Sequence, residues 1–264
     1  MTDRWEKIDK AERWFQEGLR LMEPAEFFVM EDVDMQASAE IINTLRQQGI
    51  KCTYTHIVVR ATALALARHP ELNRLMLRNR YVYLDEVDIG LSVGGELDLT
   101  VPLTVVLPQA DKKPLAQLSA EIIKRVPEVR ARDLERAVIL RKMARIFPFP
   151  WMKRILLRSM MSRLSTIKER NGTFHITCQP HLSRGAPFKS PTLAALTFSK
   201  IEDRVVARNG QPAVRSMSTF SFSGHNHTWN GNTAAILVNE IKKILEEGEL
   251  AAETNTASTA ATVR

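Results

Sequence analysis

Tyr81-Val-Tyr-Leu-Asp-Glu-Val-Asp-Ile-Gly-Leu-Ser-Val93 and Leu97-Asp-Leu-Thr-Val-Pro-Leu-Thr-Val-Val-Leu107 are the two stretches that decide the fold. Both alternate apolar with polar residues and are rich in β-branched side chains, which is typical of β-strands. Gly94-Gly95 between them predicts a turn. The two stretches therefore predict two long strands joined to each other.

Helices and further strands are predicted on both sides of this pair. Asp34 is expected to cap one of the helices and Gly49 to end it. No internal repeat or clear linker interrupts the chain, so one α+β domain is predicted over residues 1–250. Residues 251–264 are rich in Ala and Thr without apolar periodicity, and are predicted to be a disordered tail. The predicted helices span 5–22, 34–48, 53–68, 113–130 and 231–247, and the other predicted strands span 27–33, 172–178, 193–198, 204–207 and 214–222.

The composition indicates an ordinary globular protein, with 44% apolar and 25% charged residues in 264. No apolar run reaches the roughly 18 to 20 residues that a membrane span needs. The N-terminus is charged from its start and has no signal-peptide core, and two cysteines make neither a disulfide framework nor a metal site. These features predict a cytoplasmic protein.

The positive charge is concentrated in one segment, residues 137–168. It holds eight basic residues and no Asp or Glu, and removing those eight charges from the net charge of +7 leaves −1. Two prolines divide the segment into short helices that have a basic face and an apolar face, as in helices that lie on membranes. The apolar face is expected either to pack on the domain or across an oligomer, or to contact an anionic membrane or a long acyl chain. Nucleic-acid binding is not predicted, because aromatic residues are few and no nucleic-acid motif occurs.

Five short strings in the chain are similar to the catalytic domain of one family. The chain resembles the dihydrolipoamide acyltransferases of 2-oxo acid dehydrogenase complexes, which share the chloramphenicol acetyltransferase fold. The strings are His69-Pro-Glu-Leu-Asn73 (F-P-E-L-N in the family), Val87-Asp-Ile-Gly-Leu-Ser-Val93 (V-N-I-G-V-A-V), Leu99-Thr-Val-Pro-Leu103 (L-V-V-P-V), Ala110-Asp-Lys-Lys-Pro-Leu115 (A-D-x-K-S-L) and Gly172-Thr-Phe-His-Ile-Thr177 (G-T-F-T-I-S).

The resemblance implies a mixed β-sheet flanked by helices and a homotrimer with active sites between subunits. In such a site, a His of one subunit takes the proton from an acceptor, which attacks the thioester of acyl-CoA. A hydroxyl of the G-T-F-T-I-S strand in the neighbouring subunit hydrogen-bonds the oxyanion, and by position this residue is Thr177.

The segment Ser221-Phe-Ser-Gly-His-Asn-His-Thr-Trp-Asn-Gly231 resembles the family's H-x-x-x-[D/N]-G turn with one departure. Asn230 occupies the Asp/Asn position, but the position of the catalytic His holds Asn226, between His225 and His227. An amide has no useful pKa near neutrality and cannot serve as a base. Three interpretations stay open: His225 or His227 is the base, the site binds without catalysis, or the two His residues hold a metal, for which no third ligand is evident.

Other candidates are weaker. His175 shares a strand face with Thr177, and a structural role is favoured over a place in the same pocket. Cys178 alternates to the other face and is expected to be a buried structural residue. Lys112 and Lys113 do not form a lipoyl attachment site, because their string belongs to the catalytic domain.

The sequence thus predicts an acyl-CoA-dependent acyltransferase that lacks a lipoyl domain and a metal and acts on an unidentified thiol, hydroxyl or amine acceptor. His225, His227, Asn230 and Thr177 are its predicted site residues. The alternative is an inactive acyltransferase-fold protein that serves in binding or assembly, at a membrane surface or elsewhere.

Overall fold

A seven-stranded mixed sheet forms the centre of the molecule in the computed structural model, which describes residues 3–7, 26–77, 80–94, 103–132, 162–185 and 194–254 and single residues between 133 and 161. Its strand order is β2-β10-β8-β7-β5-β6, with β9 paired to β10. The β5–β7 and β7–β8 pairs are parallel and the others antiparallel. The strands are β2 (Glu26–Asp34), β5 (Ile89–Val93), β6 (Leu103–Leu107), β7 (Phe174–Gln179), β8 (Ala194–Ser199), β9 (Glu202–Arg208) and β10 (Gln211–His225).

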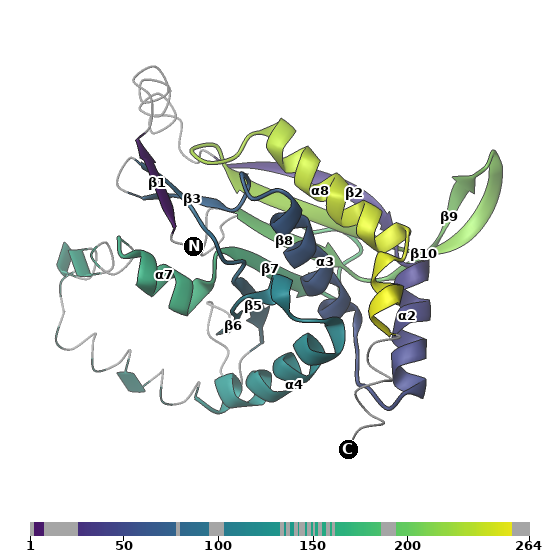
Figure 1. Ribbon diagram of the computed structural model, residues 1–264, viewed down its shortest axis with the longest axis horizontal. Coiled ribbons are helices and arrows are strands. Elements are labelled where there is room, and N and C mark those ends of the chain that lie inside the picture. Colours follow the sequence, from purple (N-terminus) through teal and green to yellow (C-terminus); the bar gives the residue numbers. More distant parts are fainter. Residues whose placement is uncertain are drawn as a thin grey trace.

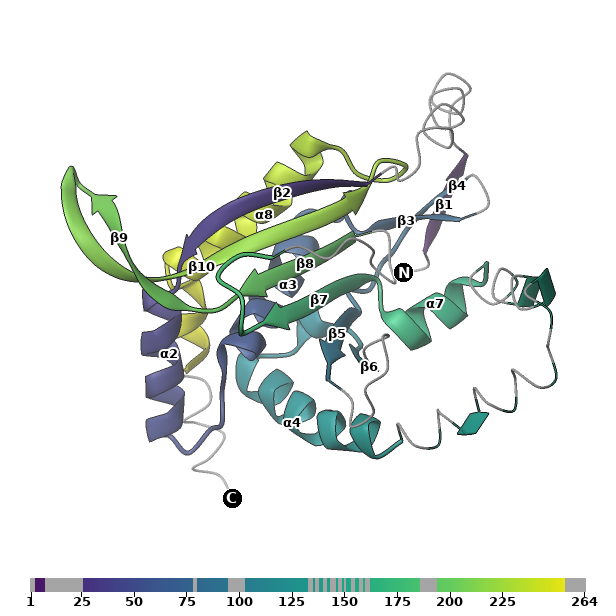
Figure 2. The same ribbon diagram turned by 180° about the vertical axis from the view of Figure 1, so that it is seen from behind.

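Four helices lie on one face of this sheet: α2 (Gln36–Gln47), α3 (Tyr54–Arg68), α4 (Leu115–Ala131) and α8 (Gly231–Glu246) (Figure 1). Under them, Ile176, Leu196 and Phe222 are in register on β7, β8 and β10, and all three are fully buried. From behind, the strands lie in front of the helices, and the long β9–β10 hairpin curves away from the body (Figure 2). The predicted mixed sheet flanked by helices is therefore confirmed.

The stretch predicted as one strand from residue 81 to 93 is two strands in two different sheets. β4 (Arg80–Tyr83) lies between β1 (Arg4–Lys7) and β3 (Arg74–Leu77) in a small three-stranded sheet, whereas β5 belongs to the large one. Leu84 donates its N–H to Asn73 and Val87 accepts from Ala110, so both ends of the connection are fixed outside either strand. Alternation along the sequence cannot reveal this break, because it shows which side chains are buried but not in which sheet a strand lies. β5 and β6 pair antiparallel, as two strands joined by a turn would, but residues 95–102 between them lie outside the described residues.

Most of the predicted helices occur with small shifts at their ends. Gly49 ends α2 in the left-handed conformation, with φ of 77°, as predicted. Asp34 is the last residue of β2 and Met35 holds the N-cap position, but the Asp34 carboxylate still accepts the N–H of Gln36 at 3.0 Å. The helix predicted over residues 5–22 is wrong for residues 5–7, which pair with β4, and its remainder lies outside the described residues.

Residues 251–254 are ordered, contrary to the predicted tail. The chain forms a 3-10 turn, η2 (Glu249–Ala251), and Glu253 then forms a salt bridge of 2.6 Å with the buried Arg60 of α3. The salt bridge with the buried Arg60 holds residues 251–254 on the domain. A search for apolar periodicity cannot detect such an interaction. Residues 255–264 lie outside the described residues.

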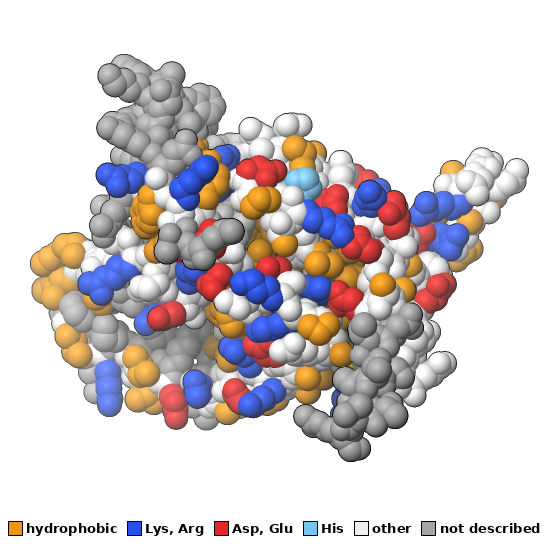
Figure 3. Space-filling view, viewed as in Figure 1, with side chains coloured by type: hydrophobic (Ala, Val, Ile, Leu, Met, Phe, Trp, Pro, Cys, Tyr) orange, Lys and Arg blue, Asp and Glu red, His pale blue; other side chains and the backbone are white. Residues whose placement is uncertain are grey.

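In the insert, Met152, Leu156 and Leu164 are half-buried and Ile167 is buried, whereas the other described apolar side chains are exposed. The exposed side chains gather at one edge of the molecule (left in Figure 3) beyond α7 (Leu164–Asn171), a helix that begins inside the predicted insert. Packing on the same chain is therefore confirmed for Ile167, which is buried in a cluster with side chains of β3 and β4. For the exposed side chains, contact with a neighbouring copy or with lipid stays a prediction. Among the described residues, no helix is both long and apolar enough to cross a bilayer. The exposed residues are Val138, Ile139, Ile146, Phe149, Trp151 and Ile155, each 48–62% exposed.

Candidate active site

A tight turn follows β10 and carries the predicted histidines. The carbonyl of His225 accepts the N–H groups of Thr228 at 2.9 Å and Trp229 at 3.0 Å, so Asn226 and His227 lie within the turn. Trp229 is buried and its ring centroid lies 5.0 Å from that of Phe222. This indole anchors the chain on the helix side of the sheet, where α8 begins.

The small sheet holds the turn from its other side. Tyr81 donates its hydroxyl to the carbonyl of His227 at 3.2 Å, and Arg74 donates to the carbonyl of Thr228 at 2.9 Å. The Arg74 guanidinium also lies 4.7 Å from the Tyr81 ring centroid, which fixes both donors. The split of residues 81–93 into two strands therefore brings β4 to the candidate site.

The rings of His225 and His227 stack with centroids 4.5 Å apart and an interplanar angle of 18°. The turn after β10 brings the two rings together. The Nδ1 atom of His225 accepts the backbone N–H of His227 at 3.4 Å. This bond uses the lone pair of Nδ1, so the proton of the neutral His225 ring lies on Nε2.

Asn230 holds the start of α8. Its side-chain oxygen accepts the N–H of Thr233 at 2.9 Å, and the Thr233 hydroxyl accepts the N–H of Asn230 at 3.0 Å. This reciprocal capping box satisfies two of the free N–H groups at a helix start. Asn230 therefore lies where the sequence places it, with its amide oxygen facing the helix.

Thr177 lies on the face of the sheet opposite the helices, in a row of hydroxyl side chains. It is in register with Thr197 on β8, which is in register with Ser221 on β10. Thr197 and Ser221 are fully buried, and neither side-chain oxygen has a hydrogen-bond partner. His225 is on the same face but four residues further along β10, roughly 16 Å from Thr177 by strand geometry. Thr177 and the two histidines therefore do not meet within one chain.

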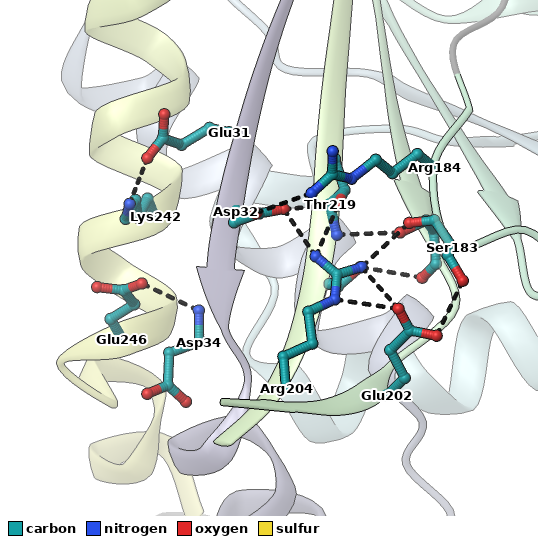
Figure 4. A network of polar contacts seen from close by, with 12 residues as sticks. Glu31, Asp32, Asp34, Ser183, Arg184, Glu202, Arg204, Thr219, Lys242 and Glu246 are labelled. Atoms are coloured by element: carbon teal, nitrogen blue, oxygen red, sulfur yellow. Dashed lines mark hydrogen bonds and ion pairs between the residues drawn. The ribbon is translucent and has the colours of Figure 1, made fainter. Parts of the chain in front are cut away.

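The other end of this face is filled by ion pairs at the base of the β9–β10 hairpin. Figure 4 shows Glu31 and Asp32 pointing to opposite sides of β2, with Glu31 facing α8. Arg204 of β9 donates to Asp32 at 2.9 Å and to Thr219 at 3.0 Å, and also pairs with Glu202. These ion pairs occupy the end of the face that lies away from His225.

Ser92 and His175 form a contact that the sequence reasoning missed. The Oγ atom of Ser92 lies 2.6 Å from Nε2 of His175, which is only 2% exposed. Both residues depart from the family strings, which have Ala and Thr at these positions. These two departures together could have indicated the contact from the sequence. Cys178 packs against the core on the helix side, the predicted face, but is half-buried and not fully buried as predicted; this partial burial raises the pKa of the thiol.

Among the described residues, no three His, Cys, Asp or Glu side chains come together as a metal site would require. The metal interpretation of His225 and His227 therefore gains no third ligand from this part of the chain.

Two buried histidines are expected to make the fold sensitive to acid. Burial lowers the pKa of both His56 and His175 from 6.5 to about 4. The unfolded chain thus binds protons that the folded chain does not, so stability falls as the pH drops from 6.5 towards 4. Each histidine contributes a slope of up to about 1.4 kcal/mol per pH unit in that window. Denaturant unfolding at several pH values should show a smaller slope for His175→Thr than for the native chain; equal slopes would contradict the assignment.

The comparisons with known proteins agree with this fold. The family described as 2-oxoacid dehydrogenases acyltransferase (catalytic domain) matches residues 20–139. A dihydrolipoyllysine-residue succinyltransferase component of the 2-oxoglutarate dehydrogenase complex of Cupriavidus necator is 27% identical over 76% of this chain and 41% of its own length. The chain thus spans less than half of the length of that relative.

Two solved structures share the architecture. The dihydrolipoamide acetyltransferase of Azotobacter vinelandii superposes with a TM-score of 0.63 at 19% identity, covering 91% of each chain. Chloramphenicol acetyltransferase superposes with a TM-score of 0.52 at 11% identity, covering 92% of this chain and all of its own. The chain therefore has the chloramphenicol acetyltransferase-like fold, and its residues 20–139 are similar to the acyltransferase catalytic domain of 2-oxoacid dehydrogenases.

The Azotobacter vinelandii structure was determined to investigate a serine, a histidine and an asparagine in the catalytic mechanism, with the asparagine four residues after the histidine. In this chain, the residue four positions before Asn230 is Asn226. The family match ends at residue 139, before β7 and before the turn after β10.

Proposed function

We propose that the chain is an acyltransferase domain that transfers an acyl group from acyl-CoA to a thiol, hydroxyl or amine acceptor, in a site formed between copies of a homotrimer. The observation that carries this proposal is the placement of Thr177 and His225 on one face of the sheet, roughly 16 Å apart. A second copy docked on that face would bring its own histidines to Thr177. The buried, unpartnered hydroxyls of Thr197 and Ser221 also lie on that face.

The reaction needs one base and one oxyanion donor. An imidazole of the turn takes the proton of the acceptor, the acceptor attacks the thioester carbonyl, and the Thr177 hydroxyl of another copy stabilises the oxyanion. The C–S bond then breaks, and the CoA thiolate takes up the proton. Since the lone pair of His225 Nδ1 already accepts the N–H of His227, the geometry favours His227 as the base and His225 as its stacking partner.

The second candidate function is a non-catalytic binding or assembly subunit, and Asn226 is the observation that favours it. The amide lies at the position where the similar enzymes carry the catalytic histidine and cannot take a proton. If this second function is correct, the protein retains the fold and the row of hydroxyl side chains but lacks a catalytic base.

One assay separates the two candidates. Release of CoA from short-chain and long-chain acyl-CoA, with and without reduced lipoamide, is expected to fall on the order of 10²- to 10⁴-fold in the His225→Ala/His227→Ala double variant. The two single variants should show the larger loss for His227→Ala. His69→Ala is the control, because His69 follows α3 and contacts Glu71 at 3.3 Å.

The opposite pattern would support the second candidate. A silent native protein that gains turnover from Asn226→His retains the pocket but not the base. Light scattering should also give a mass three times that of the 29.9 kDa chain. A monomer with full turnover would exclude a site shared between copies.

A further inference from the structure

A second chemical site lies entirely within one chain, where β5 and β7 run side by side. Gly90 is in register with His175 and Leu91 with Ile176, so Ser92 follows beside Thr177. The 2.6 Å contact between Ser92 Oγ and His175 Nε2 crosses from one strand to the other. Ser92 is half-buried, so its hydroxyl can be reached, whereas the imidazole is buried.

The surroundings of His175 decide which nitrogen carries its proton. Nδ1 is buried without a hydrogen bond of good geometry, and the main-chain carbonyl of Asn171 is the polar group that acts on it. A carbonyl oxygen favours an N–H group at Nδ1 over a lone pair, so the lone pair lies on Nε2. Nε2 therefore accepts the proton of the Ser92 hydroxyl, which is the arrangement of a nucleophile and its base.

Further hydroxyl groups surround Ser92 on the same face of the sheet. Thr104 of β6 is directly opposite Ser92, and Thr177 of β7 lies beside it on the other side. Two hydroxyls flanking a nucleophile are suited to donate hydrogen bonds to an oxyanion that forms on it. The pair also departs from the family strings, in which Ala at position 92 would leave the imidazole without its partner.

We propose that Ser92 is a nucleophile that takes up the acyl group as an ester, with His175 as its base. This inference rests on the proposed acyl transfer from an acyl-CoA thioester. Ser92 Oγ attacks the thioester carbonyl and its proton moves to His175 Nε2. The C–S bond breaks, and the CoA thiolate leaves as a thiol with that proton.

In the second half of the reaction, the acceptor attacks the ester carbon. The histidine turn of a neighbouring copy takes the acceptor's proton and passes it to the Ser92 oxygen as the ester bond breaks. The two groups of histidines thus serve separate half-reactions. Burial holds the pKa of His175 at about 4, so the ring is neutral at neutral pH but is a weaker base than an exposed imidazole.

The test is to find the ester. The native chain is mixed with acetyl-CoA or octanoyl-CoA without an acceptor, quenched, and measured by intact-mass spectrometry and peptide mapping. An acyl group on Ser92 is expected in the native chain and in the His225→Ala/His227→Ala double variant. It should be absent from Ser92→Ala and form on the order of 10²-fold more slowly in His175→Thr.

Controls separate chemistry from folding. Ser92→Ala and His175→Thr carry the residues of the family strings, and thermal unfolding checks that both fold. Ser216→Ala is the matched serine control, because Ser216 lies on the hairpin and donates to Asp203 at 2.9 Å. It should form the ester as the native chain does.

The outcomes distinguish this inference from the proposed function. CoA release at an undiminished rate in Ser92→Ala, without an ester, would overturn the covalent route and leave acyl transfer standing. Neither release nor ester would overturn both. Labelling of Ser92 by an alkyl fluorophosphonate, lost in His175→Thr, would support the nucleophile even where acyl-CoA is not the donor.

Discussion

Replacing Gly90 by Ala is expected to lower the free energy of unfolding by more than about 3 kcal/mol, beyond the usual cost of overpacking. A Cβ atom on Gly90 would lie 2.0 Å from the carbonyl oxygen of Asn171 and 3.0 Å from Nδ1 of His175. The obstructing oxygen belongs to the main chain at the end of α7 and cannot rotate away. Relief therefore requires β5 to separate from β7, where Gly90 pairs with His175. Denaturant unfolding measures the loss.

Gly94→Ala is the matched control for this prediction. Gly94 directly follows β5, has no left-handed φ, and a Cβ atom there would meet nothing within 4 Å. Its replacement should change the unfolding free energy by less than about 0.5 kcal/mol. Similar losses in both variants would show that β5 and β7 are not packed as closely as the structure has them.

Replacing Glu253 by Ala is expected to cost about 3 to 5 kcal/mol. Its carboxylate pairs with the buried Arg60 at 2.6 Å and accepts the N–H of Leu115, the first residue of α4, also at 2.6 Å. Pro114 at the N-cap has no side chain that could accept a hydrogen bond from the start of α4. The carboxylate of Glu253, although distant in sequence, therefore accepts one of the free N–H groups of that helix. Without the carboxylate, a buried guanidinium loses its counter-charge.

Glu249→Ala provides the control from the same C-terminal segment. Glu249 pairs with Arg68 at the surface, where the two side chains are 42% and 40% exposed. Solvent screens this pair, so its loss should cost no more than about 1 kcal/mol. If Glu253→Ala were no worse than Glu249→Ala in denaturant unfolding, Glu253 would not hold residues 251–254 on the domain.

Short-range patterns were sufficient for much of the fold. Alternation predicted β5 and β6, an apolar run rich in Ala predicted α3, and apolar periodicity predicted α8. These signals lie within a few residues of one another, because the period of a strand or a helix is a property of the local backbone. The same signals failed at residues 81–93, where one alternating stretch crosses between two sheets.

The candidate site shows the same division. The sequence by itself determined the turn with His225 and His227, the hydroxyl of Thr177, the strand pair β5–β6 and the charge of the insert. Only the tertiary structure decided that β5 lies beside β7, which brings Ser92 to His175 although 83 residues separate them. The tertiary structure also placed Thr177 and His225 at separate positions on the sheet face opposite the helices, and it brought Glu253 into contact with Arg60. These are long-range contacts, and they depend on which faces become buried together when the whole chain folds.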